Sequence, residues 1–255
     1  MARAFWKGVI SFGMVAIPVR LSLATESQTP AFHYLHKKDL VRPKQVLYCP
    51  ADNEYIERSD TVRGYEYAKD RYVVFDDEDF EKVPVRTSHA IEISAFIKIE
   101  EIDLIYYEGS HYLEPEELGV KPFALLRTVL EKTGRVAIAK VAFQRREHLC
   151  CLRPVDDTLV LHTLNYTENI LPRPDIPAPK QAISDAELNM ATKLVEAMSS
   201  DFQPEQYHDE YSQALKKMVE AKLQGVEIEA PKEEKFEIED LMEALKASVA
   251  AAGKA

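Results

Sequence analysis

The first twenty residues alternate apolar and polar side chains with a change of phase that restricts how they can fold. Trp6, Ile10 and Phe12 share one period-two face, whereas the apolar residues of 15–21 have the opposite parity, and the phase changes around Gly13. A buried helix would show i, i+3, i+4 spacing without a phase change. We therefore predict a strand that bends or bulges at the glycine, as at the corner of a barrel.

Further apolar runs predict more strands. Short polar turns join several of them, as in a meander of antiparallel strands. One helix interrupts the series at about 121–133, because Phe123, Leu126 and Leu130 share one face and Gly134 is a typical C-terminal stop. The predicted strands lie at 72–75, 90–99, 136–144, 149–155 and 158–166.

Two segments differ from this strand-rich pattern. Residues 31–69 have weak periodicity and few core candidates, so we expect an extended excursion from the core. After the proline-rich stretch 171–180 the composition becomes helical, and Ser184 with Glu187 forms a capping-box pattern. The apolar face expected for that helix contains Leu188, Leu194, Val195 and Met198, and a second helix is expected from about Pro204 to Gly225.

The chain ends with a charged linker at 226–237 and a short amphipathic helix at 238–249. Ile238, Leu241, Leu245 and Val249 lie along one stripe of that helix. A helix of this length is not stable in isolation. Its stripe therefore packs either on the rest of the chain or on a partner, and the preceding linker makes the partner a serious alternative.

The 255 residues carry a formal net charge of −11, but the positive and negative side chains are unevenly distributed along the chain. Residues 119–153 contain eight Lys or Arg against two Glu, whereas 70–118 contain 14 acids against four bases and 184–255 contain 16 against eight. The opening strand carries Lys7 and Arg20 and no acid. An acidic protein can thus present one positive face, which nucleic-acid binding requires.

The remaining composition excludes several classes of protein. An apolar run at 9–19 imitates a secretory signal, but Gly13 and Pro18 interrupt it, and no stretch reaches the length of a membrane-spanning helix. Three cysteines, of which Cys150 and Cys151 are adjacent, suit a reducing compartment. We expect a soluble, cytoplasmic protein.

Motifs of catalysis and metal binding are absent from the sequence. There is no GxxxxGK[ST], GxGxxG, HExxH or GxSxG, so we expect no enzyme and no cofactor. Cys49 in CPAD has Asp52 where a second thiol would stand, and Asp is a poor structural-zinc ligand. The acidic run 76–81 reads as a solvated turn rather than a magnesium site. We expect no bound metal.

At this point the order of the motifs resembles a known family over nearly the whole chain. RAFWKGVISFGMVAIPVRL, FHYLHKKD, RGYEYAKDRYVVF, LLRTVLEKTG, HLCCLRP, ELNMATKLVEAM, FQPEQYHDEY and DLMEALKASV are similar to stretches of the bacterial Ku family of DNA-end-binding proteins. The resemblance implies a mixed β-barrel plus α fold. It places a barrel core at 1–180 with a DNA-encircling bridge at 31–69, a helical arm at 181–225, and the linker with the short helix at 226–255.

The resemblance also implies a function. Ku proteins act in non-homologous end joining, where two subunits close a ring around a double-stranded DNA end and recruit an ATP-dependent, multi-domain DNA ligase. Since this chain has one copy of the unit, a homodimer associated with the nucleoid is implied. Ligase recruitment falls to the final helix, through Leu241 and Leu245.

DNA contacts are expected from cations that match the family pattern. A protein that accepts any end needs cations aimed at phosphates rather than base-edge readout. Lys7, Arg20 and the basic run 121–140 are weaker candidates. The residues expected to contact DNA are Lys37, Lys38, Arg42 and Lys44 in the bridge and Arg145 and Arg146 at a turn of the barrel.

Two other functions fit the same residues. The chain could be an acidic, dimeric scaffold whose partners are only proteins, with structural basic patches. It could also be a weak lyase on damaged DNA ends that uses a lysine Schiff base, which requires a lysine of depressed pKa near the DNA. Loading on linear but not circular DNA separates the first alternative from end binding, and borohydride trapping tests the second.

Overall fold

The structure of the protein is a computed structural model that describes residues 4–83, 89–143, 146–177, 183–225 and 241–252. Its contacts divide the chain into two units. One unit comprises Met1–Ser27 and His33–Pro172, and the other comprises Gln28–Phe32 and Arg173–Ala255. Among the described residues, none of the helices is long and apolar enough to span a bilayer. The division predicted at residues 180 and 225 stays a prediction.

The opening apolar stretch forms a hairpin rather than one bent strand. Strands β1 (Trp6–Phe12) and β2 (Val15–Leu23) are antiparallel, with Ile10 paired to Ile17. Gly13 has φ 58°, as the first central residue of a type II′ turn requires. The two-residue turn pairs even-numbered residues with odd-numbered ones, which produces the phase change. The predicted bend at Gly13 was therefore wrong.

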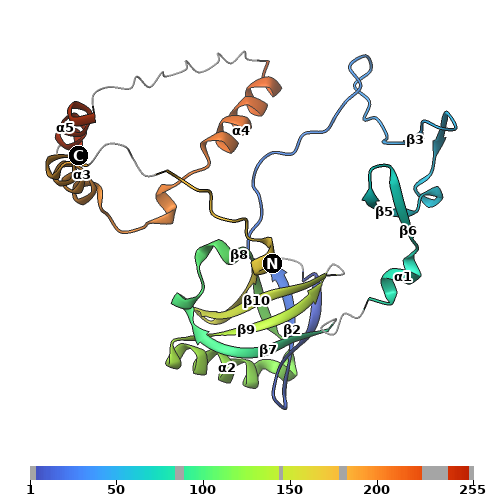
Figure 1. The fold of residues 1–255 in the computed structure, drawn as a ribbon, viewed down its shortest axis with the longest axis horizontal. Coiled ribbons are helices and arrows are strands. Elements are labelled where there is room, and N and C mark those ends of the chain that lie inside the picture. Colours follow the sequence, from blue (N-terminus) through green and yellow to red (C-terminus); the bar gives the residue numbers. More distant parts are fainter. Residues whose placement is uncertain (1–3, 84–88, 144–145, 178–182, 226–240, 253–255) are drawn as a thin grey trace. The chain divides into compact units, whose positions relative to one another are not determined.

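Seven strands close into a barrel, in the order β1-β2-β8-β11-β10-β9-β7. Its interior is filled by alternate side chains of each strand, among them the fully buried Ile17, Leu113 and Leu161. Figure 1 shows the barrel in blue, green and yellow. The predicted β-barrel with additional helices is confirmed. The other strands are β7 (Ala90–Lys98), β8 (Tyr107–Pro115), β9 (Arg135–Phe143), β10 (Arg146–Val155) and β11 (Thr158–Leu164).

Helix α2 (Val120–Thr133) packs its apolar face against β9 and β10, as Figure 1 shows below the barrel. Phe123, Leu126 and Leu130 are buried, and Gly134 ends the helix in the left-handed conformation, with φ 61°. The predicted helix and its stop are thus confirmed. Gly119 precedes it where a Cβ would lie 2.5 Å from the Pro18 carbonyl oxygen, so only glycine allows this approach.

The adjacent cysteines lie on opposite faces of β10. Cys150 belongs to the barrel core, whereas Cys151 packs outside it with Val136 and Leu164. Neither forms a disulfide, as expected for neighbours on one strand. Burial raises the pKa of both thiols, that of Cys151 to about 11. Both cysteines are therefore buried residues that pack against apolar side chains, one inside the barrel and one outside it.

Two histidines of the barrel couple its stability to pH. Burial lowers the pKa of His111 and of His162 below the ordinary 6.5. The unfolded chain therefore takes up protons near pH 6.5 that the folded barrel does not accept, so their contribution is complete above that pH and is lost as the pH falls below it. We expect the free energy of unfolding to fall between pH 7.5 and 5.5, by at most about 1.4 kcal/mol per pH unit for each group.

Denaturant unfolding at the two pH values measures this effect. The carboxyl groups with lowered pKa titrate below this range, so they do not obscure it. His111→Gln should reduce the pH dependence of the free energy of unfolding. Equal pH dependence in the wild type and the His111→Gln variant would contradict the assignment.

The predicted excursion at 31–69 is extended and exposed, and this exposed segment continues to residue 83. No residue from 31 to 83 is buried, and we call this whole range the excursion. Its strands pair only locally, in two separate two-stranded sheets. The strand predicted at 72–75 is present as β6, but it pairs with β5 outside the barrel. The elements are β3 (Leu47–Cys49), β4 (Glu54–Ile56), β5 (Arg63–Ala68), β6 (Arg71–Phe75) and the short helix α1 (Asp77–Glu81).

The second unit is helical, with α3 (Asp185–Met198), α4 (Glu210–Leu223) and α5 (Leu241–Ala252). The Ser184 capping box of α3 is confirmed, because the Ser184 hydroxyl accepts from the Glu187 amide and the Ser184 amide donates to the Glu187 carboxylate. Helix α4 begins later than predicted because Asp209 caps it by accepting from the Ser212 amide. The predicted linker at 226–237 lies outside the described residues.

The apolar face predicted for α3 was only partly right. Leu194 is half-buried, but Leu188, Val195 and Met198 are exposed. The covered face contains Met190 and Leu194, because α5 packs against that side of α3. Both faces carry apolar side chains, so the sequence pattern alone could not select between them.

Candidate nucleic-acid interface

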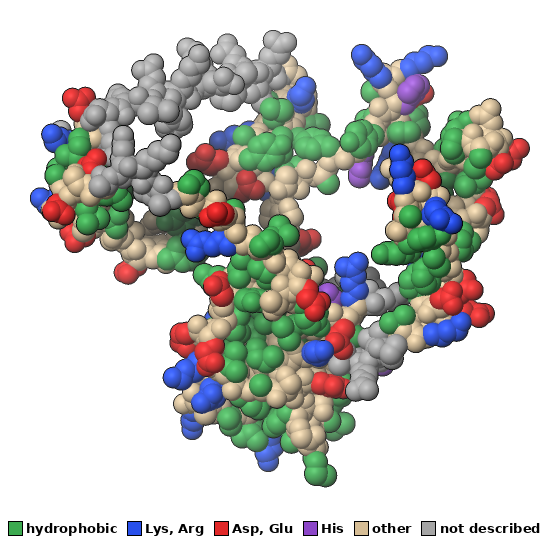
Figure 2. Space-filling model, viewed as in Figure 1, with side chains coloured by type: hydrophobic (Ala, Val, Ile, Leu, Met, Phe, Trp, Pro, Cys, Tyr) green, Lys and Arg blue, Asp and Glu red, His purple; other side chains and the backbone are tan. Residues whose placement is uncertain are grey.

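The motif HKKD forms the tip of a loop between β2 and β3. The His36 amide donates to the Val41 carbonyl (2.8 Å), and the Leu40 amide donates back to the His36 carbonyl (2.7 Å). These bonds close a turn in which Lys37 and Lys38 are exposed. Figure 2 shows blue side chains projecting at the end of this loop. We call residues His36–Val41 the tip loop.

The exposed side chain of Asp39 closes the tip loop through two bonds. Its carboxylate accepts from the His36 imidazole (Nδ1–Oδ2 2.9 Å) and from the Val41 amide (3.1 Å). The hydrogen bond from His36 lowers the pKa of the Asp39 carboxyl, and the bond from Val41 adds to this effect. Leu40 adopts φ 58°, a conformation that non-glycine residues rarely take. The one acid of the motif therefore shapes the turn.

The four predicted bridge cations have no ion-pair partner in the described part of the chain. Lys37, Lys38, Arg42 and Lys44 are exposed, and none forms an ion pair with another described residue. Their charges are therefore available to an external anion. The phosphate backbone of a nucleic acid is an anion that exposed Lys and Arg side chains bind.

Four of the weaker candidates are different, because Lys7, Arg20, Arg127 and Lys140 each lie beside a carboxylate. Lys7 lies 3.4 Å from Glu116, and Arg20 lies 3.8 Å from Glu114. In the basic run, Lys140 lies 2.8 Å from Glu147, and that contact raises the pKa of the lysine. These pairs lie mostly at the protein surface, so each stabilises the fold only weakly. They nevertheless reduce the positive potential that the sequence suggested for the barrel.

The other predicted site residues are only partly described. Arg146 is exposed at the start of β10, paired in register with Phe143 across the turn from β9. Arg145 lies outside the described residues. Of the predicted ligase contacts, Leu245 is half-buried in α5, whereas the side chain of Leu241 lies outside the described set.

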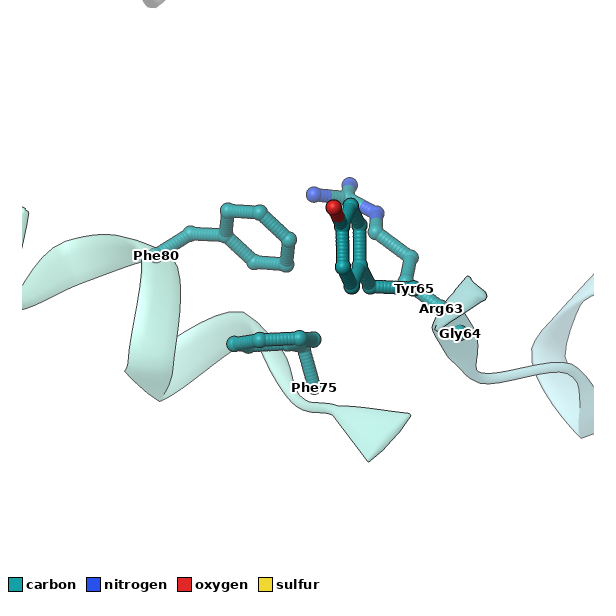
Figure 3. A pocket seen from close by; sticks show the side chains of 5 residues that line it. All are labelled: Arg63, Gly64, Tyr65, Phe75 and Phe80. Atoms are coloured by element: carbon teal, nitrogen blue, oxygen red, sulfur yellow. The ribbon is translucent and has the colours of Figure 1, made fainter. Parts of the chain in front are cut away.

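A pocket of about 340 Å³ lies between β5, β6 and α1. Figure 3 shows Tyr65, Phe75 and Phe80 around it, with the Arg63 side chain behind Tyr65. The Arg63 guanidinium lies 4.6 Å from the centre of the Phe80 ring and 3.5 Å from the Asp77 carboxylate. Since this cation is already paired and α1 is acidic, the pocket does not suit a phosphate.

Apolar side chains along the excursion are also uncovered. Tyr34 is 90% exposed and Tyr55 75% exposed, and Tyr65, Val73 and Val74 are exposed too. Figure 2 shows green side chains at the surface of this part of the chain. Uncovered apolar surface gathered in one segment is typical of a surface that takes part in an interaction.

The chemistry around Cys49 offers no metal site. Its thiol donates to the Asp52 carboxylate (3.1 Å), so the residue in the second ligand position is an internal acceptor. Within the described ranges, no group of three or more His, Cys, Asp or Glu side chains could hold a metal ion.

Sequence reasoning found the cations but missed the pair that positions them. His36 and Asp39 are three residues apart on either side of the two lysines, and this spacing allowed their hydrogen bond. The acid inside a basic motif was the available signal, because Asp favours turns through bonds to nearby amides.

The sequence of this chain is similar to one protein family and to several of its members. The family described as "Ku70/Ku80 beta-barrel domain" matches residues 11–190. A "Non-homologous end joining protein Ku" of Solibacter usitatus is 43% identical over 253 residues, which cover 99% of this chain and 95% of that protein. Proteins of the same name from Archaeoglobus fulgidus and Pseudomonas aeruginosa are 38% and 39% identical, and the matches cover 98% of this chain and 99% and 88% of those proteins.

Among solved structures, the SPOC domain of human PHD-finger protein 3 aligns over 64% of this chain and 95% of that chain, with 12% identity and a TM-score of 0.32.

Proposed function

This chain belongs to the Ku family, and from that premise we propose that it forms a homodimeric ring that binds double-stranded DNA ends regardless of sequence. We further propose that it recruits an ATP-dependent, multi-domain DNA ligase for non-homologous end joining, acts in the cytoplasm on the nucleoid, and has no catalytic step of its own. The observation that carries the proposal is the tip loop, whose exposed lysines form no ion pair with any residue that the structure describes.

Phosphate contact explains binding without sequence preference. Duplex DNA carries one negative charge for about every 1.7 Å of its axis, whatever its bases. Lys37, Lys38, Arg42 and Lys44 meet this charge, and none of them has a carboxylate partner to displace in the described structure. Each cation releases condensed counterions from the DNA, so affinity depends steeply on salt.

The homodimer is supported by the uncovered apolar surface of the excursion. A single chain leaves Tyr34, Tyr55 and Tyr65 in water, at a cost of about 25 cal/mol for each Å² of apolar surface. A second copy offers the same side chains, so a two-fold pairing of excursions covers both sets. Two copies joined in this way form the closed ring, and topology then retains the protein on a threaded end.

A comparison of linear and covalently closed circular DNA of one sequence tests the proposal. The ring should load on the linear duplex and slide, but it should not load on the circle. Raising salt from about 50 to 200 mM should weaken loading by about 10³-fold or more if six or more phosphates are contacted. Blocking both ends of the linear DNA with bulky adducts should prevent loading.

Equal binding to the circle and the linear duplex would reject end threading. Absence of binding to either would favour the acidic, dimeric scaffold whose partners are proteins. Sedimentation of the free protein supplies the second criterion, because a ring of two copies requires a dimer.

A further inference from the structure

The final helix is covered on one side by the helix that precedes it in the unit. Helix α5 packs against α3, and Figure 1 shows the two as neighbours, in red and light brown. On α5 the half-buried side chains include Met242, Leu245 and Val249, which lie three and four residues apart on one stripe. On α3 they include Met190 and Leu194.

This contact is shallow. Neither helix has a fully buried side chain among the described residues, so only part of each apolar stripe leaves water. A helix of 12 residues is marginal when isolated, so the contact with α3 also supports the helical state of α5. Contacts with few buried apolar side chains open at a low cost in free energy, so a partner can compete with them.

The stripe on α3 and any external partner compete for the same side chains. The rest of α5 is polar or small, with Glu243, Lys246 and Ser248 exposed. A partner that receives α5 in a groove needs its large apolar side chains. Among the described side chains of α5, the large apolar ones are Met242, Leu245 and Val249, and they form the half-buried stripe that covers α3.

We propose that α3 is an internal docking site for α5 which withholds the ligase-binding stripe, so that the ligase must displace α3. The inference rests on the proposed recruitment of the ligase by α5. If the undocked form is about a tenth of the population, docking weakens the apparent affinity for the ligase about tenfold. Variants that undock α5 without altering its own sequence should therefore bind the ligase more tightly.

Met190→Asp in the full chain is the test variant, with Leu194→Asp as the second. Both place a charge in the contact while leaving α5 intact, and half-buried positions of a surface helix tolerate this change. Val195→Asp is the matched control, because this residue lies on the same helix and is 66% exposed. Hydrogen exchange over residues 241–252 reports docking, and titration with the purified multi-domain ligase of the same genome reports affinity.

We expect Met190→Asp to speed exchange in α5 and to tighten ligase binding about three- to tenfold, while the Val195→Asp variant matches the wild type. Unchanged exchange would show that the contact does not hold α5. Faster exchange with unchanged or weaker ligase binding would show that docking does not withhold the stripe. Leu245→Glu separates failure of the docking proposal from failure of the proposed ligase recruitment. If the ligase still binds the Leu245→Glu variant, α5 does not recruit it.

Discussion

Replacing Lys37 and Lys38 by alanine should weaken binding to linear DNA on the order of 10²-fold and flatten its salt dependence. The two lysines stand exposed in the tip loop, and neither makes an ion pair with a described residue, so their loss removes phosphate contacts without disturbing the fold. A dimer loses four such contacts. The slope of log K against log salt should therefore become shallower by about 3 to 4. Titration by fluorescence anisotropy at several salt concentrations measures both quantities.

The matched control is the other adjacent pair of lysines. Lys216 and Lys217 are exposed on α4, and their replacement by alanine changes the net charge by the same amount. If only net charge mattered, both double variants would lose the same affinity. Equal losses, or full affinity in the Lys37→Ala/Lys38→Ala variant, would remove the tip loop from the interface.

A substitution of Asp39 tests, in the same assay, whether DNA binding depends on the shape of the tip loop or only on its charge. The Asp39→Ala variant gains positive charge but loses the bonds from His36 and Val41 that close the turn. A DNA site defined by charge alone would bind more tightly in this variant. The shape of the tip loop matters if the affinity does not rise.

Deleting residues 231–255 should abolish ligase stimulation while DNA-end binding stays within about twofold of the wild type. The deletion removes α5 but leaves the barrel, the excursion, α3 and α4. Its loss exposes only a shallow apolar stripe on α3, because no side chain of α3 is fully buried. Joining of linear DNA by the ligase and binding of the same DNA are measured side by side.

The control for this deletion is Ala250→Glu, at an exposed position of α5 away from the apolar stripe. This variant should stimulate the ligase as the wild type does. Loss of DNA binding in the deletion variant would refute the separation of the two functions. Retained ligase stimulation would place the ligase contact elsewhere in the chain.

Local signals in the sequence predicted helix α2 and the start of helix α3 correctly. Phe123, Leu126 and Leu130 with a following Gly134 specified α2, because both its apolar face and its stop depend on residues less than one helix length apart. Ser184 and Glu187 specified the start of α3 for the same reason. The strand β8 was missed, because Gly109, Ser110 and His111 interrupt its apolar pattern and it becomes a strand by pairing with β2 and β11.

The sequence predicted which cations belong to the candidate site, but not which of them form ion pairs. The motif HKKD showed two lysines, but the sequence could not show that Asp39 bonds to His36 and that neither lysine pairs with a described carboxylate. In the sequence, Lys140 looked as available for DNA as Lys37 and Lys38. The pairing of β9 with β10, however, places Glu147 beside Lys140. Whether a cation is free depends on which acids the fold brings near.

By itself, the sequence determined the periodicities, the Ser184 cap, the helix stop at Gly134 and the segregation of charge, since each arises between residues close along the chain. Only the tertiary structure decided that Gly13 reverses the chain rather than bending it, which strands close the barrel, and which face of α3 receives α5. The physical reason is that apolar side chains are buried with similar gain against any apolar surface. The choice among such surfaces is made by long-range packing, which no local pattern encodes.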